Sequence, residues 1–321
     1  MLSSFRRSYI QTLFDMNNNF YWPVYKNLER ELIELSDVIH INDEQLGIYS
    51  IKIVEMLIRT VVEVESISKE LYFLNGGEKL DDKDLFFDTV CIGLLENKWH
   101  LSKKKVQISA TNFYFNLDKN RVFTPLNKAN KRGTSSSDWQ KAYQAVKHSR
   151  VESLTKGNLK NLIWAMAGLF VLNLYYKDNI YELGKDATGT NFDNGFGSSI
   201  FSVKIHKNQT ISIGVDYSKD ADFDECIYLV KSTDVTRNVV RDAIKVLNEK
   251  VAEKQSINIL DAASKPIAEM TTFNHDELNE KLKNIKPATV DIKQVAIENG
   301  QLLRTALEGL KYEAILNKQQ Y

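Results

Sequence analysis

The chain has 321 residues, of which 43% are hydrophobic and 26% are charged, close to the averages of globular proteins. This composition excludes a disordered or low-complexity chain, and the length favours two domains that each bury a core. Lysine plus arginine and aspartate plus glutamate both number 42, so the formal net charge is zero. Any contact with nucleic acid must therefore come from a local basic patch.

Residues up to about 180 show the three- and four-residue spacing of apolar side chains that is typical of helices. Gly76-Gly77 ends the longest of these patterns, and Asn42 or Asp43 can cap its beginning. Residues 104–125 instead have extended chemistry, which predicts a short hairpin or a loop arm. The predicted helices of this half are 23–39, 43–74, 81–99, one that begins at a Ser137 capping box and ends near Arg150, and the apolar segment 162–176.

Beyond residue 180 the pattern changes to a mixture of strands and helices. Two alternating stretches, 200–206 and 210–218, predict a β-hairpin around Lys207-Asn208, and 226–232 predicts a third strand. The helices predicted here are 235–254, with Thr233 or Asp234 as its cap, 276–285 and 298–316.

These patterns predict a mainly α fold in two parts. We expect an N-terminal helical bundle over 1–180, followed by a smaller α+β region over 181–321 with a short antiparallel sheet. Residues 1–14 lack the apolar run of a secretory signal, and 162–176 is shorter than the roughly 18 to 20 residues that cross a bilayer. We therefore expect a cytoplasmic protein without membrane contact.

One helix presents a polar face that can carry chemistry. Lys141, Gln144 and His148 are spaced at i, i+3 and i+7, so their side chains project from the same face. The apolar residues of this helix lie on the opposite face and are predicted to enter the core: Trp139, Ala142, Tyr143 and Val146.

A basic cluster, Lys147, His148 and Arg150, lies near the end of this helix. Histidine exchanges a proton near neutral pH, and the two neighbouring cations can hold a phosphate and its developing charge. The three residues are therefore catalytic candidates for RNA cleavage through the 2′-hydroxyl, with Lys141 and Gln144 in support. The alternative is structural, because basic residues at a helix C-terminus also balance the helix dipole.

The run W-x3-Y-x3-KH-x-R, residues 139–150, leads into an Asn-containing helix rich in Ala and Leu. It resembles the signature of HEPN-like helical domains of bacterial defence and toxin proteins, over about residues 45–178. The resemblance implies a helical bundle that dimerises and, in many members, a metal-independent ribonuclease. It therefore implies RNA as a ligand, a role in phage defence and no cofactor. The arginine that precedes the active histidine in those ribonucleases has no counterpart here, and some relatives bind or sense without cleaving.

Three functions follow as alternatives. The first is a HEPN-like ribonuclease, and the second is a non-catalytic HEPN-like sensing or binding module that contacts a protein partner through 181–321. The third is a helical assembly protein. A binding module predicts an exposed aromatic patch, for which the loop 111–117 is a candidate, although this loop can equally pack on the bundle.

Two further residues are supporting candidates on the long helix. Arg59 and Glu63 are spaced as an i, i+4 ion pair that the bundle can bring near His148, and a plain surface ion pair is the alternative.

No pattern of metal ligands is recognisable in the sequence. The acidic run 216–225 lacks the glycine and glutamate positions of an EF-hand loop, so it predicts a solvated turn. Cys91 and Cys226 lie far apart and are interpreted as reduced core thiols. The remaining histidines are scattered without ligand-like spacing, and we predict no metal: His40, His100, His206 and His275.

Overall fold

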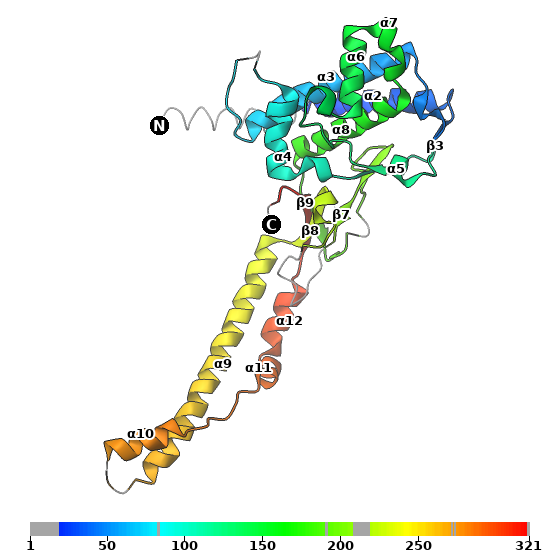
Figure 1. The fold of residues 1–321 in the computed structure, drawn as a ribbon. Coiled ribbons are helices and arrows are strands. Elements are labelled where there is room, and N and C mark those ends of the chain that lie inside the picture. Colours follow the sequence, from blue (N-terminus) through cyan, green and yellow to red (C-terminus); the bar gives the residue numbers. More distant parts are fainter. Residues whose placement is uncertain are drawn as a thin grey trace, which may run out of the picture.

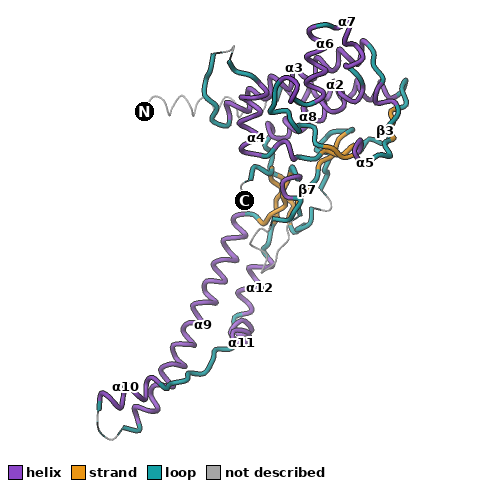
Figure 2. The backbone as a smooth tube through the Cα atoms, viewed as in Figure 1, coloured by secondary structure: helices purple, strands orange, loops and turns teal. Residues whose placement is uncertain are grey.

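The computed structural model describes residues 19–81, 84–189, 192–207, 219–270, 272 and 274–319. Figures 1 and 2 show a helical body, a small region of strands beside it, and a long helical arm that extends away from these strands. The fold is mainly helical with a few short strands, as the sequence predicts.

The helical body is built around one apolar helix, α8. This helix spans Leu159–Lys177 and is buried along almost its whole length, because it has no polar side to present to water. Gly157 precedes it at a close approach, since a Cβ there would lie 2.4 Å from a methyl of Val54. The helices around α8 are α2 (Tyr21–Ser36), α3 (Ile51–Leu74), α4 (Gly93–Trp99) and α6 (Asp138–His148), with the short α5 (Asp118–Arg121) and α7 (Arg150–Ser153) between them.

Within the described part of the chain, none of the helices combines the length and the apolar character that crossing a membrane requires. The apolar segment predicted from the sequence is thus the central core helix of this body.

Helix α3 begins later than predicted. Its cap is Ser50, whose side chain accepts the backbone N–H of Ile53. The predicted caps are used elsewhere: Asn42 accepts N–H groups of a 3-10 turn at Gln45–Gly47, and Asp43 accepts those of the chain near residue 116. The next predicted helix is also shorter, because a π-helical turn at Phe87–Ile92 leads into α4.

The extended residues between 104 and 125 form a hairpin, as predicted. Strand β2 (Val106–Ile108) pairs antiparallel with β4 (Val122–Phe123), and its other edge pairs with β6 (Phe201–Val203). Between them, β3 (Phe113–Tyr114) pairs in parallel with β1 (Ile41–Asn42). The loop 111–117 packs through Phe113 and Phe115, which are buried, while Tyr114 stays exposed.

A second sheet has the strand order β5-β9-β8-β7 in the described residues. Its strands are β5 (Tyr181–Gly184), β7 (Ile205–His206), β8 (Tyr228–Ser232) and β9 (Tyr312–Leu316). The pairs β5–β9 and β8–β9 are antiparallel, and β7 pairs with β8 in parallel. Strand β8 confirms the third predicted strand, whereas the predicted partner 210–218 lies outside the described residues.

One helix prediction near the C-terminus is wrong. The helix expected over 298–316 ends at Glu308, and the chain then enters β9. Tyr312, Ala314 and Leu316 are buried and alternate with partly exposed residues, which is the period of a strand. The pairing of β9 with both β5 and β8 overrides the helical propensity of this segment.

The arm consists of α9 (Asp234–Ala268), α10 (His275–Lys283), α11 (Ile292–Glu298) and α12 (Gly300–Glu308) (Figure 1). Thr233 caps α9 by accepting the N–H of Thr236, as predicted, but the helix continues well past the expected end at 254. A small cluster of Val240, Ala243 and Ala306 packs α9 against α12 near the sheet.

The predicted division at residue 180 stays a prediction. The main hydrophobic core contains residues from both sides of it, such as Phe170 of α8 and Tyr228 of β8. The β2–β6 pair also joins the two sides.

Candidate functional site

A cavity of about 690 Å³ opens on the helical body between α3 and α6. Its remaining walls are residues 85–88 before α4, and residues 132–134 with Ser136, which lead into α6. Among the described residues that line it, the cations are Lys69, Arg132, Lys141 and Lys147, beside His148, and the carboxylates are Glu65 and Asp88. Cations thus outnumber carboxylates in this cavity, on a chain whose net charge is zero.

Helix α6 places most of the predicted site residues in this cavity. The capping box of Ser137 and Gln140 fixes where the helix begins, as predicted. Its buried face holds Trp139 and Tyr143, so the opposite face is turned outward. The exposed residues that line the cavity from this helix are Lys141, Gln144, Lys147 and His148.

Arg150 does not line the cavity. The helix ends at His148, and Ser149 has φ −144° and ψ 76°, which turns the chain away before α7 begins at Arg150. The basic cluster of the sequence is therefore divided by a break in the backbone, with Arg150 exposed beyond it.

Arg59 and Glu63 do not form the expected i, i+4 pair. The Arg59 guanidinium lies 2.7 Å from the Glu31 carboxylate of α2, and Lys52 pairs with the same carboxylate. Glu31 reaches this position because α2 packs across α3. Neither Arg59 nor Glu63 lines the cavity.

The residues of α3 that line the cavity are Glu65 and Lys69. Burial raises the pKa of Glu65, although Lys147, Tyr143 and Lys69 act to lower it. A carboxyl group with a raised pKa that lies among cations is a candidate for proton transfer. The sequence offered only the i, i+4 spacing of Glu65 and Lys69, which is common on helices, so both residues were missed.

An aromatic wall closes one side of the cavity. The Arg132 guanidinium lies over the Phe86 ring, 3.7 Å from its centroid, and Phe86 is 38% exposed. A flat cation on a flat ring gives a surface on which a nucleobase can stack. Arg132 lies in the basic and polar run 128–137, which is typical of an exposed loop, but the sequence could not show what this loop faces.

One of the histidines that are scattered in the sequence lies close to two carboxylates in the structure. His206 lies with Asp220 and Asp222, and one potential ligand atom of each lies within 4.8 Å of the others. Because His206 and Asp220 are far apart in the sequence, the sequence alone does not show that they are neighbours. Part of the acidic run therefore faces a buried imidazole and is not simply a solvated turn, while Asp216 lies outside the described residues.

Both cysteines are buried and free, which confirms their interpretation as reduced core thiols. Burial raises the pKa of Cys91 to about 11 and that of Cys226 to about 12, so both stay protonated near neutral pH.

Comparisons with models of known protein families, with curated proteins and with solved structures gave no match to this chain.

Proposed function

We propose that this chain is a HEPN-like RNA-handling protein whose cavity between α3 and α6 binds RNA and cleaves it without a metal ion. The observation that carries the proposal is that His148 is exposed in one cavity together with Lys147, Lys69 and Arg132. The likeness of 139–150 to the HEPN signature supports the same class and extends the proposal to a homodimer in phage defence.

The lining residues supply each function that RNA cleavage needs. Lys147 and Lys69 bind the phosphate, and Arg132 on Phe86 holds a neighbouring base. His148 takes the proton of the 2′-hydroxyl, whose oxygen then attacks the adjacent phosphorus. The 5′-oxygen leaves with a proton from Glu65, which burial favours in its protonated form. The products are a 2′,3′-cyclic phosphate and a free 5′-hydroxyl.

A second function uses the same cavity without cleavage. It is favoured by the missing arginine of the family motif and by Arg150, which the break at Ser149 removes from the cavity. In this case the cavity only binds RNA, and the arm within 181–321 contacts a protein partner through its exposed apolar residues, such as Val239 and Leu260.

The test is degradation of several labelled single-stranded RNAs by the purified full chain, with and without EDTA. The variant is His148→Gln, and the matched control is His40→Gln, which removes an exposed imidazole that does not line the cavity. Cleavage that resists EDTA and is lost only in His148→Gln supports the ribonuclease. RNA binding without cleavage supports the non-catalytic binding function. Absence of both RNA binding and cleavage contradicts both proposed functions.

A further inference from the structure

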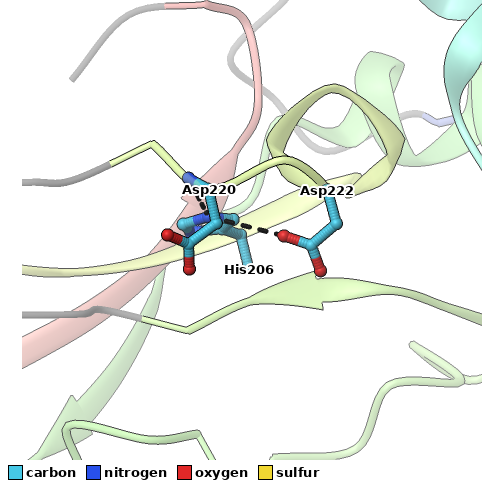
Figure 3. A group of neighbouring side chains, drawn as sticks. All are labelled: His206, Asp220 and Asp222. Carbon is cyan, nitrogen blue, oxygen red and sulfur yellow. Dashed lines mark hydrogen bonds and ion pairs between the residues drawn. The ribbon is translucent and has the colours of Figure 1, made fainter.

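Three side chains with metal-binding chemistry meet beside strand β7, in a part of the fold that shares no residue with the RNA cavity. His206 comes from β7, while Asp220 and Asp222 come from the turn before a short 3-10 helix at Phe223–Glu225. Figure 3 marks two contacts to the imidazole of His206, one from the backbone N–H of Asp220 and one from the carboxylate of Asp222.

One ring nitrogen of the imidazole faces this group. Nε2 of His206 accepts the backbone N–H of Asp220 at 3.3 Å, so this nitrogen carries no proton, and an ion bound to its lone pair would replace this hydrogen bond. The same Nε2 lies 3.7 Å from Oδ1 of Asp222. One potential ligand atom from each of three side chains thus lies within 4.8 Å of the others, an arrangement that a cation among them would stabilise.

Packing fixes the histidine in this position. The side chain of His206 is only 1% exposed, and the Phe223 ring meets it edge-on with the centroids 5.4 Å apart.

Lys204 orients the second carboxylate from outside the group. Its ammonium lies 2.9 Å from Oδ2 of Asp222 and 3.1 Å from the Glu225 carboxylate. Because Lys204 holds Oδ2, the other oxygen of Asp222 is the one turned to His206. This is the usual arrangement of an outer group that positions a metal ligand.

We propose that His206, Asp220 and Asp222 bind a divalent transition-metal ion, with Zn²⁺ bound more tightly than Mn²⁺. One imidazole nitrogen and two carboxylate oxygens suit both ions, and N/O ligand sets favour zinc. Three protein ligands leave a coordination position for water. The ion links β7 to the turn that precedes β8, and so fastens the edge of the second sheet.

The test is calorimetric titration of the full chain, freed of metal with a chelator, with ZnCl₂ and then MnCl₂. We expect about one Zn²⁺ per chain, and a loss of affinity of about tenfold or more in Asp220→Asn, since one of three ligands is weakened. His40→Gln is the matched control and keeps wild-type affinity. Circular dichroism in metal-free buffer checks that Asp220→Asn is folded.

Lys204→Met gives an independent readout. The ammonium holds Oδ2 of Asp222 and so directs Oδ1 to the site, and its removal is expected to weaken Zn²⁺ binding about tenfold or more. A Co²⁺-loaded sample identifies the ligands, because the proposed set gives a visible spectrum without the thiolate charge-transfer band that Cys226 would add. Absence of Zn²⁺ binding, unchanged affinity in Asp220→Asn, or a thiolate band overturns the proposal. Asp220→Asn is expected to bind RNA like the wild-type chain. A failure of the metal-site proposal can therefore be distinguished from a failure of the proposed RNA-binding function.

Discussion

Single buried polar residues tie distant parts of this chain together. Glu29 of α2 is 1% exposed and accepts the Tyr25 hydroxyl at 2.8 Å. It also accepts the backbone N–H groups of Ser199 at 2.9 Å and Ile200 at 3.3 Å, just before β6. Lys26 balances its charge. One carboxylate therefore fastens an early helix to a strand that follows residue 180.

Glu29→Gln is expected to destabilise the protein by about 1–3 kcal/mol at neutral pH, because an amide accepts these hydrogen bonds less well and leaves Lys26 without its charge partner. Burial raises the pKa of Glu29, but the hydrogen bonds from Lys26, Ser198 and Tyr25 outweigh it, so the pKa is lowered. The carboxylate thus contributes its full stability above the ordinary glutamate pKa, about 4.3, and loses it as the pH falls through the lower folded value.

Urea unfolding of wild type and variant at several pH values checks this. The difference in the free energy of unfolding between wild type and Glu29→Gln should become smaller in acid. Glu34→Gln, on the exposed side of the same helix, is the control. An equal difference at every pH would contradict the role of the charge.

Lys104 is a buried cation that lowers the stability of the fold at neutral pH, whereas the Glu29 carboxylate raises it. It is fully buried, and its ammonium donates to the backbone carbonyl of Cys226 at 3.0 Å. Burial lowers the pKa of Lys104 to about 8. Folding at neutral pH therefore has to keep an ammonium in the interior, and stability rises as the pH passes from that value toward the ordinary lysine pKa of about 10.4.

Lys104→Met is expected to stabilise the protein by about 1–3 kcal/mol at pH 7, with a gain that shrinks toward about pH 10. The Cys226 carbonyl keeps a partner, because Asn317 also donates to it at 3.0 Å. Chemical unfolding at both pH values measures the gain. A loss of stability at pH 7 would show that the Lys104 hydrogen bond outweighs the cost of its burial.

At the level of elements, helix α6 decides the geometry of the cavity between α3 and α6. Its N-terminal capping box joins Ser137 to Gln140, and the Gln140 amide also donates to the Ala129 carbonyl at 3.0 Å. The cap thus holds both the helix and the loop that brings Arg132 to the cavity.

Ser137→Ala is expected to cost about 1 kcal/mol of stability, the usual loss for an N-cap. It should also weaken RNA binding a few-fold, because the loop before α6 loses its anchor. Ser135→Ala, at an exposed position two residues earlier, is the matched control and should stay within about 0.5 kcal/mol of wild type. Unfolding curves and RNA affinity measured on both variants decide whether the cap positions the cavity.

Elements with local signals were predicted well, and those set by distant partners were not. The capping box of Ser137 and the Thr233 cap both lie within four residues of the atoms they bind, so the pattern reveals them. Strand β9 depends on β5 and β8, far away in the chain, and was taken for helix. The same limit applies to the site: His148 and Lys147 share a recognisable run, whereas Glu65 and Arg132 come to the cavity only through packing.

At the scale of the whole molecule, the arm is an insertion into a β-hairpin. Ser232 at the end of β8 pairs with Tyr312 at the start of β9, and the Thr233 N–H donates to the Lys311 carbonyl at 2.9 Å. The entire arm lies between these two neighbouring positions (Figure 1). Its own buried cluster is small, while many of its apolar residues are exposed.

Replacing residues 234–310 with Asn-Gly should therefore leave a folded body. A two-residue Asn-Gly turn is the favoured link for antiparallel strands in this register. The shortened protein is expected to stay monodisperse, to unfold cooperatively and to bind RNA like the full chain. Aggregation or loss of RNA binding would show that the arm completes the body or the cavity.

The central claim, that the cavity between α3 and α6 binds RNA, is tested most directly by the RNA affinity of matched lysine variants. The double variant Lys69→Gln/Lys147→Gln removes two cations of the cavity, and Lys245→Gln/Lys250→Gln removes two cations of the arm. Fluorescence anisotropy with a single-stranded RNA, over a range of salt concentrations, gives both the affinity and its salt dependence. The structure predicts a loss of about tenfold or more and a shallower salt dependence for the cavity pair alone. Equal losses in both pairs, or no RNA binding by the wild-type chain, would contradict it.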